Sequence, residues 1–415
     1  MKTYLFVYSI GPVQSFIAAA RKTEDFWSGS YLLSHLTEKT IERALEQKTY
    51  NVQLISPSIT LEDLQIHKAD PSPVASLPNR FLLRLEASSD EEVRQFGDDL
   101  TETTKAAFHL LGKRAFYNVF PGLRDNEHMH ALIEKQLNGL LEIFWAFEAW
   151  DPTTKAYNDV RKTVERRLAS VKNNRIYSDE PQDGLVCTVC GMREALHEGN
   201  IDEHHRIGQM RRIIEQTWRK RAAKYQEKSE ESGSWIKNNE RLCAVCLTKR
   251  VAREIFYEHH VFESFPSVVD FATENNPYYA IIMMDGDDMG KWINGDDGKL
   301  LDGFDKVDER YHKEFSRRLT VFSKEKVPTI VGDKSNENGP PKKGKLVYAG
   351  GDDVLAFMKL KDLLPTVKQL RSTFSSDEVL GKKATVSMGI VIAHEKEPLQ
   401  LVIQTVQQED NENPL

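Results

Sequence analysis

The residues with the clearest chemical potential are Gly350-Gly351-Asp352-Asp353, which lie between two apolar segments. Paired glycines permit a tight two-residue turn, and they allow a phosphate to come close to the backbone. The two carboxylates that follow would then sit on a rigid turn at the edge of a sheet. Taken alone, the pattern is explained equally well as an ordinary hairpin turn, because all four residues favour turns.

A second acidic run, Asp285-Gly286-Asp287-Asp288, follows an apolar segment earlier in the chain. Asp285 would face the hairpin, because the first and third strands of a ferredoxin-like sheet are neighbours. Clustered carboxylates repel one another unless a cation lies between them. Mg²⁺ (or Mn²⁺) suits the site because it takes oxygen ligands and shares them with a triphosphate, and a metal pair can activate a 3′-hydroxyl. We therefore predict that Asp285, Asp352 and Asp353 are catalytic metal ligands.

Residues next to these carboxylates are candidates for nucleotide binding, together with the hairpin glycines. The amides from Gly286 to Gly290 are expected to enter a helix and hold phosphate oxygens, with Lys291 nearby as a point charge. Asp287 and Asp288 belong to the same candidate set, although either can instead cap the helix.

The chain has four cysteines, in two Cys-x-x-Cys pairs: Cys187, Cys190, Cys243 and Cys246. Four thiolates make a closed tetrahedral Zn²⁺ site with a structural role. A redox role is the alternative, but the pairs lack a thioredoxin-like βαβ context. Structural zinc is therefore predicted. His197, His204 and His205 lie nearby and are expected to be surface residues rather than zinc ligands.

A basic stretch lies between the cysteine pairs. From His205 to Lys224 seven lysines or arginines accompany one acid, Glu215. Arg211-Arg212 and Arg219-Lys220-Arg221 fall about two turns apart on the predicted helix. This face either follows an RNA backbone or is an ordinary solvated helix face.

The composition limits the possible classes. The chain has 415 residues, of which 40% are apolar and 29% charged, so several cores can form and general disorder is not expected. Its 56 basic and 63 acidic residues give a net charge of -7, which is no general signature of nucleic-acid binding. No segment approaches the ~20 apolar residues of a membrane helix. Cysteines spaced for metal binding indicate a reducing compartment, so a cytoplasmic protein without membrane contact is expected.

The order of predicted elements indicates an α+β fold. The first part reads β-α-α-β-β-α, with a break at Ser28-Gly29-Ser30, and the last part reads β-α-β-β-α-β. The stretch from Glu134 to His260 reads as helical. We predict two ferredoxin-like domains (1–125 and 273–415) flanking a helical zinc-binding domain (126–272).

Several motifs resemble the large subunit of type III-B (Cmr-type) CRISPR effector complexes, and they span nearly the whole chain. The motifs are Ser9 to Ile17, Ala20 to Thr23, Ser28 to Leu33, Leu77 to Phe81, Leu242 to Leu247 with Lys249-Arg250, Asp285 to Gly290, and Gly350 to Asp353.

The resemblance implies two palm domains, related to nucleotide cyclases, around a zinc-bearing helical domain. The palm with the Gly-Gly-Asp-Asp motif would convert ATP into cyclic oligoadenylate and release pyrophosphate. The other palm would hold a second ATP, with Gln14 and Ser15 near the nucleotide cleft, unless Gly11-Pro12 is only a turn. The implied partners are other Cmr-type subunits, the CRISPR RNA and a target RNA that switches synthesis on.

Two other functions compete with this interpretation. One is transfer of AMP from ATP to a different acceptor, and the other is an idle palm within a scaffold for the CRISPR RNA. Many family members also carry a nuclease domain marked by a His-Asp pair. The sequence contains no His-Asp dipeptide, so DNA cleavage by this chain is not expected.

Overall fold

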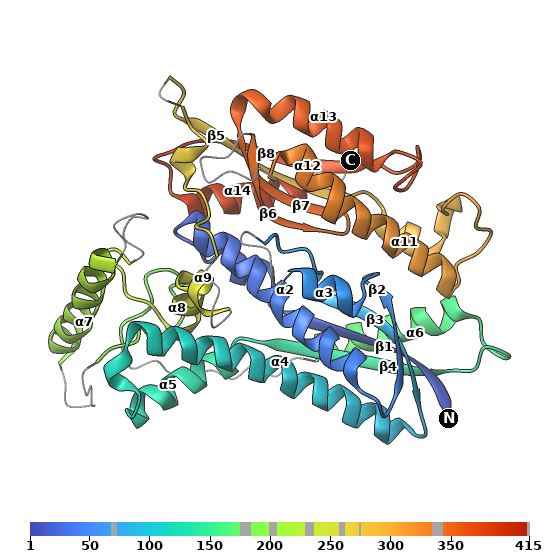
Figure 1. Ribbon diagram of the computed structural model, residues 1–415, viewed down its shortest axis with the longest axis horizontal. Helices are drawn as coiled ribbons and strands as arrows, with labels where there is room; N and C mark the ends of the chain where they lie inside the picture. Colours follow the sequence, from blue (N-terminus) through green and yellow to red (C-terminus); the bar gives the residue numbers. More distant parts are fainter. Residues whose placement is uncertain are drawn as a thin grey trace.

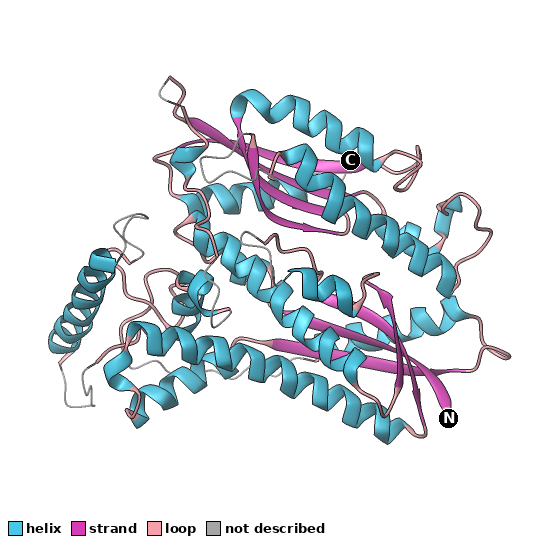
Figure 2. Cartoon of the chain, in the orientation of Figure 1, coloured by secondary structure: helices cyan, strands magenta, loops and turns pink. Residues whose placement is uncertain are grey.

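Two four-stranded antiparallel sheets and the helices that cover them form most of the molecule (Figure 1, Figure 2). The structure is a computed structural model, and it describes residues 1–67, 73–174, 184–198, 206–228, 236–256, 262–273, 275–333 and 343–412. His204 and His205 lie outside these ranges. No helix in the described ranges combines the length and apolar composition needed to cross a bilayer.

The first unit is built on the sheet β2-β3-β1-β4. Its strands are β1 (Lys2–Gly11), β2 (Asn51–Ser56), β3 (Arg80–Ala87) and β4 (Glu142–Trp150). Almost every residue of β1 is buried, because β1 is a central strand with helices on both faces. The helices α2 (Thr23–Glu46) and α4 (Asp90–Val119) pack on one face, and α6 (Tyr157–Asn173) packs on the other.

Two details of the sequence interpretation were wrong. The stretch from residue 134 to 260 is not helical throughout, because β4 lies in it and pairs with β1 from Thr3↔Trp150 to Gly11↔Glu142. The first sheet is thus completed by residues beyond 125. The helix α2 also runs without interruption through Ser28-Gly29-Ser30. A glycine at position 29 leaves room for the side chain of the buried Lys249, because a Cβ there would lie 3.0 Å from its Cε.

The second unit repeats the strand order, as β6-β7-β5-β8. Its strands are β5 (Tyr278–Gly286), β6 (Gly344–Gly350), β7 (Asp353–Lys359) and β8 (Val386–His394). One face is covered by α11 (Glu309–Val321), α12 (Val327–Val331) and α13 (Leu363–Phe374). The short α10 (Met289–Asn294) follows β5, and α14 (Leu399–Glu412) packs against β5 and β8.

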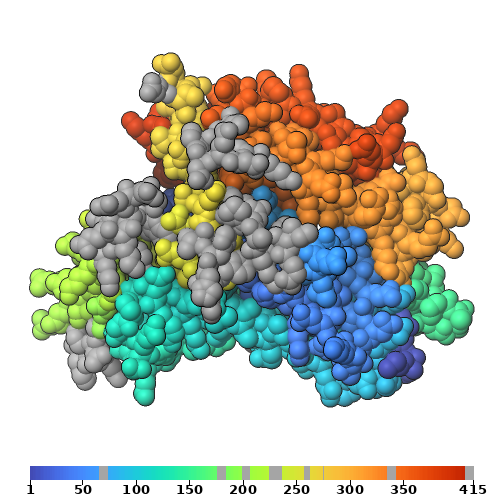
Figure 3. Space-filling model, in the orientation of Figure 1, coloured from blue at the N-terminus to red at the C-terminus, as the bar shows by residue number. Residues whose placement is uncertain are grey.

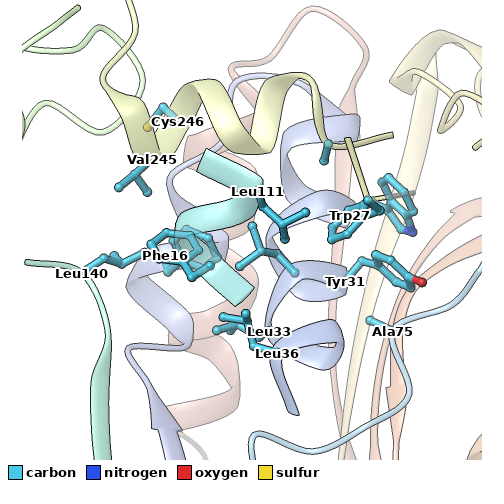
Figure 4. Close-up of a cluster of buried hydrophobic side chains, with 14 of the residues drawn as sticks. Phe16, Trp27, Tyr31, Leu33, Leu36, Ala75, Leu111, Leu140, Val245 and Cys246 are labelled. Atoms are coloured by element: carbon cyan, nitrogen blue, oxygen red, sulfur yellow. The ribbon is translucent and has the colours of Figure 1, made fainter. Parts of the chain in front are cut away.

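The cysteines and most of the remaining helices lie at one end of the molecule, beside the first unit (Figure 1). This part comprises α5 (Glu127–Asn138), α7 (Ile207–Lys228), α8 (Ala244–Arg250) and α9 (Ala252–Ile255). The helix α8 packs against α2, α4 and α5. Figure 4 shows the resulting apolar contact, in which Val245 of α8 lies near Phe16, and Trp27 and Tyr31 of α2 lie further along.

The two units pack on each other reciprocally. The long helix between the first and second strands of each unit lies on the second strand of the other unit, since α2 contacts β6 and α11 contacts β2. In the first unit, the segment before β3 also pairs with β6: Ala75 forms a bridge with Tyr348, and the Ala75 carbonyl accepts a 2.9 Å hydrogen bond from the Ala349 amide. These contacts bring the hairpin that follows β6 next to the first unit.

Candidate metal and nucleotide site between the two units

The hairpin between β6 and β7 has a two-residue loop, Gly351-Asp352, closed by the pair Gly350↔Asp353. Gly351 has a φ of +69°, which an L residue rarely adopts. Gly350 is required for a different reason, because a Cβ there would lie 2.2 Å from the hydroxyl oxygen of Tyr348. The two glycines together fix the direction in which the following carboxylates point.

Three carboxylates meet at this hairpin. Because β7 pairs with β5, the end of β5 brings Asp285 beside the hairpin, and one oxygen from each of Asp285, Asp352 and Asp353 lies within 4.8 Å of the others. Burial raises the pKa of Asp352 to about 6, and the negative charge of Asp285 adds to this effect. An all-oxygen donor set of this charge fits Mg²⁺ or Mn²⁺, which would relieve the repulsion.

Gly286 makes this close approach possible. A Cβ at position 286 would lie 2.9 Å from Cβ of Asp352 and 3.0 Å from its Oδ2. The residue after Asp285 therefore has to be glycine if the Asp352 carboxylate is to lie against the end of β5. The sequence motif contained this glycine, but its steric role becomes apparent only from the pairing of the strands.

The other charged residues of the run after β5 have different partners. Asp287 accepts a 2.6 Å hydrogen bond from the Ser387 hydroxyl. Asp288 adopts a left-handed backbone conformation and pairs with Lys299 at 2.7 Å, and this contact lowers the pKa of Asp288. Lys291 pairs with Asp288 at 3.4 Å and with Asp297 at 3.1 Å. The side chain of Asp288 makes no capping hydrogen bond to α10.

A cavity of about 680 Å³ lies between the two units and includes the hairpin in its wall. On the side of the second unit it is lined by Gly290 and by all four residues from Gly350 to Asp353. The predicted nucleotide-site residues that do not line it are Gln14, Ser15, Asp285, Gly286, Asp287, Asp288 and Lys291. Gln14 and Ser15 are exposed on the short helix α1 (Gln14–Ala18).

Cations form the opposite part of the wall. Arg80 at the start of β3 and Arg161, Lys162 and Arg166 on α6 all line the cavity. Burial lowers the pKa of Arg161, whose guanidinium is held by the side chain of Asn294 in α10. Glu165 of α6 also lines the cavity and pairs with Arg80, and Lys324 lines it from the second unit. The four cations of the first unit therefore share the lining with carboxylates, around a space that can hold a polyanion and its counter-ions. The sequence interpretation missed these four residues, because they are remote from the acidic motifs and carry no motif of their own.

The second candidate metal centre is formed by the cysteines. The Sγ atoms of Cys187, Cys190, Cys243 and Cys246 lie within 4.8 Å of one another. The Cys246 amide donates to Sγ of Cys243, and the Val189 amide donates to Sγ of Cys187, each over 3.4 Å. Four sulfur donors supported by amide groups fit Zn²⁺ with no position left for a substrate. His197 is buried rather than at the surface, and it is not part of this cluster.

Two buried cations connect the cysteine cluster to the first unit. The Lys249 ammonium donates to the carbonyls of Phe16 and Ala19, each at 2.7 Å, at the end of α1. Arg250 forms a bidentate pair with Asp25 at the start of α2, at 2.6 and 2.9 Å, and a further pair with Glu240 at 2.6 Å. Lys249 and Arg250, which belong to one of the motifs quoted in the sequence analysis, therefore have a structural function.

Comparison with known proteins identifies both units. The family described as Cas10/Cmr2, second palm domain, matches residues 278–413, and the family described as CRISPR-associated protein Cmr2, N-terminal, matches residues 5–113. The CRISPR system Cmr subunit Cmr2 of Pyrococcus furiosus is 24% identical over 94% of this chain. The chain spans 57% of the length of that relative.

Solved structures share the fold. The type III-B Cmr-beta complex bound to cognate target RNA contains a chain that matches 99% of this chain and 68% of its own length, with a TM-score of 0.68 and 15% identity. The Csm1–Csm4 cassette in complex with one ATP matches 98% of this chain and 52% of its own, with a TM-score of 0.51 and 12% identity. Since the two family models together match most of the chain, and the Cmr2 relative aligns with nearly all of it, the chain belongs to the Cas10/Cmr2 family.

Proposed function

We propose that this chain is a metal-dependent nucleotidyltransferase that joins ATP molecules into cyclic oligoadenylate and releases pyrophosphate. The observation that carries the proposal is the cavity between the two units, which Asp352 and Asp353 line from the second unit and four cations line from the first, Arg80 among them being paired with Glu165. A nucleoside triphosphate needs both kinds of wall, because its phosphates attract cations while its metal ions attract carboxylates. The Csm1–Csm4 cassette, which shares the fold, has been solved with one ATP.

The residues of the chain would divide the work as follows. Asp285, Asp352 and Asp353 would hold divalent ions, which supply charge neutralisation and a more nucleophilic hydroxyl. Gly350 and Gly351 would let the phosphates approach the hairpin backbone, and the amides from Gly286 to Gly290 would remain candidates for phosphate binding. Arg80 and the cations of α6 would orient the triphosphate of a second nucleotide, so that its 3′-hydroxyl meets the first nucleotide in line.

The setting of this activity is part of the proposal. We infer that the chain works inside a type III-B effector complex with other Cmr-type subunits, a CRISPR RNA and a target RNA, in the cytoplasm. The cysteine cluster would hold structural Zn²⁺. The classification as two ferredoxin-like palms flanking a zinc-binding domain, and the ranges 1–125, 126–272 and 273–415, remain predictions. Gln14, Ser15, Asp287, Asp288 and Lys291 remain candidates for nucleotide contact in a bound state.

The test measures pyrophosphate release and Mn²⁺ binding. With the assembled complex, target RNA, ATP and Mg²⁺, we expect Asp352→Asn/Asp353→Asn to reduce turnover by at least about 100-fold, a typical loss when essential charge stabilisation is removed. The chain alone should lose Mn²⁺ binding in a calorimetric titration. The matched control is Asp98→Asn/Asp125→Asn, which removes two exposed carboxylates far from the cavity.

Each alternative has its own outcome. Full turnover by the hairpin double variant would refute the site. Pyrophosphate release with ATP alone, followed by mass spectrometry, separates ring formation from transfer of AMP to another acceptor, because the latter yields no oligoadenylate. No turnover by the wild-type complex, with Mn²⁺ binding intact, would indicate an idle scaffold.

A further inference from the structure

The basic helix α7 has two unlike faces, and only one of them is used for packing. Ile214, Trp218 and Ala222 are buried, and the Trp218 indole donates a 2.8 Å hydrogen bond to the Leu196 carbonyl. On the same side, the Arg221 guanidinium lies over the Phe120 ring at 4.9 Å. These contacts hold α7 firmly against the part of the chain that carries the cysteines, so its outer face has a fixed orientation.

The outer face of α7 is positively charged. Arg211, Arg212, Arg219 and Lys220 are all exposed on it, and Glu215 is the acid among them. Arg211 is neutralised by Glu215 at 2.8 Å, whereas for Arg212, Arg219 and Lys220 the described residues show no ion pair. Solvated helix faces commonly alternate in charge, so three cations on one face with no ion pair to any described residue depart from that pattern.

The charged face continues onto the cysteine cluster through Arg241. The pKa of Glu215 lies below its usual range because Arg211 hydrogen-bonds to it, and the charges of Arg219 and Arg241 add to the effect. Arg241 is therefore close to the middle of α7. Its Nε donates a 3.0 Å hydrogen bond to the carbonyl of Val186, which immediately precedes Cys187.

Exposed apolar side chains flank the first cysteine pair in the chain. Val186 is 44% exposed, and Met192, two residues after Cys190, is 64% exposed. Single-stranded nucleic acid is bound by cations that follow its phosphates together with flat groups, either aromatic rings or arginine guanidinium planes, on which unpaired bases stack. The exposed guanidinium groups of Arg212 and Arg219 can supply such planes, and Val186 and Met192 add apolar contact. A base-paired duplex would leave the apolar side chains without a partner.

We propose that the outer face of α7, together with Arg241, Val186 and Met192, is a binding surface for single-stranded RNA. Figure 3 shows α7 in lime green at the rim of the molecule, on the opposite side from the end of α11. The helix is about 33 Å long, and Arg212 and Arg219 are separated by about 10 Å along it, which lets them contact different phosphates of one strand. The net charge of the chain is -7, so its overall charge does not attract RNA and binding has to depend on local basic surfaces such as this one.

This surface is independent of the nucleotidyl-transfer site, and its test is independent too. The probe is a fluorescein-labelled single-stranded oligouridylate, titrated with the zinc-loaded full chain and followed by anisotropy at several salt concentrations. The variant Arg212→Gln/Arg219→Gln/Lys220→Gln should bind about tenfold or more weakly at low salt. The slope of log binding constant against log salt concentration should also be smaller in magnitude by about 2, because each of the three lost phosphate contacts contributes ~0.7.

The control variant removes the same charge elsewhere. Lys361→Gln/Lys368→Gln/Lys382→Gln changes three exposed lysines of the second palm and should bind RNA like the wild type, as should Asp352→Asn/Asp353→Asn. Met192→Ser should weaken binding of oligouridylate but not of inorganic polyphosphate, which has no bases.

Three results would overturn the proposal. The first is equal affinity of the α7 triple variant and the lysine control, with both variants shown to be folded by their melting temperatures. The second is tighter binding of duplex than of single-stranded RNA. The third is displacement of the RNA by polyglutamate at equal charge concentration, which would assign the face to an acidic protein.

Discussion

At the scale of single residues, the carboxyl group of Asp352 lies where ionisation is unfavourable unless a cation is bound. It is half-buried against the end of β5, and the adjacent Asp285 adds repulsion. The hairpin thus holds a high-energy arrangement of charge in place by backbone geometry. Such arrangements occur where a ligand supplies the missing stabilisation.

The metal-free protein should therefore gain stability when this charge is removed. The pKa of Asp352 is raised to about 6, so the folded state retains a proton that the unfolded chain has lost between pH 4 and pH 6. The free energy of unfolding falls as the pH rises through this window. We expect Asp352→Asn to be more stable than the wild type by about 1–2 kcal/mol at pH 7 in chelator, and equally stable near pH 4. Urea titrations at both pH values measure this, and equal stability at pH 7 would contradict it.

The contact between Gly286 and Asp352 gives a second prediction at this scale. Gly286→Ala places a methyl group 2.9 Å from Cβ of Asp352 and must displace the carboxylate. We expect at least about a tenfold loss of pyrophosphate release, since misplaced ligands cost large factors in rate, with retained folding. Gly122→Ala is the control, because a Cβ at Gly122 meets no atom within 4 Å. Unchanged turnover of Gly286→Ala would show that the carboxylates need not approach so closely.

At the scale of elements, the helix α8 connects the cysteine cluster to the first helices of the first unit. Cys243 and Cys246 lie at its beginning, and Lys249 and Arg250 lie at its end. Lys249, Arg250, Asp25 and Glu240 are at most 2% exposed, so their charges can be accommodated only by one another and by backbone carbonyls. The orientation of α8 therefore determines where α1 and α2 begin.

Breaking this connection should be costly. Arg250→Met leaves Asp25 and Glu240 without their shared counter-charge, and we expect a loss of about 3–5 kcal/mol in the free energy of unfolding. Arg43→Met is the control, because Arg43 pairs with Asp99 at 2.8 Å on the surface and should cost less than about 1 kcal/mol. Denaturant titration of the zinc-loaded protein compares the two. Similar losses for both variants would show that Arg250 is no more important than a surface arginine.

The elements also show how far the sequence could predict the structure. The acidic hairpin, the strand before it and the cysteine pairs were identified because each is local, with glycines, apolar runs and spacing that carry the signal. The strand β4 was missed, since its Phe144-Trp145 and Phe147 suit a helix as well as a strand, and only pairing with β1 decides. Arg161 and Arg166 were missed because their role depends on a second unit folding against α6.

At the scale of the whole molecule, the cavity exists only because the two units are held together by polar contacts. Arg84 of β3 pairs with Glu309 of α11 at 2.9 Å. His312 of α11 accepts from the Tyr157 hydroxyl of α6 at Nδ1, and donates from Nε2 to the carbonyl of Ile293, both at 2.8 Å. Burial lowers the pKa of His312 to about 4, so the ring is neutral at pH 7 and Nδ1 can accept while Nε2 donates.

Acid should weaken the contact between the palms. Between pH 6.5 and pH 4 the unfolded chain binds a proton at this histidine that the folded protein does not, so His312 lowers the free energy of unfolding as the pH falls. Its share is up to about 3 kcal/mol. The difference in the free energy of unfolding between the wild type and His312→Gln should decrease by this amount from pH 7 to pH 4. Asp352 changes in the opposite sense, and comparison of the two proteins at each pH cancels its effect. A pH-independent difference would contradict the assignment.

The reciprocal packing of α2 on β6 and α11 on β2 has a consequence for anyone who dissects the chain. Each helix covers the edge strand of the other unit. The segment at Ala75 also pairs with β6 and so occupies hydrogen-bonding groups at the edge of that strand. If either half were expressed separately, its edge strand would be uncovered and could pair with the same strand of another copy. The separated halves should therefore aggregate. Co-expression of the two halves should give soluble protein, whereas mixing them after separate expression should not.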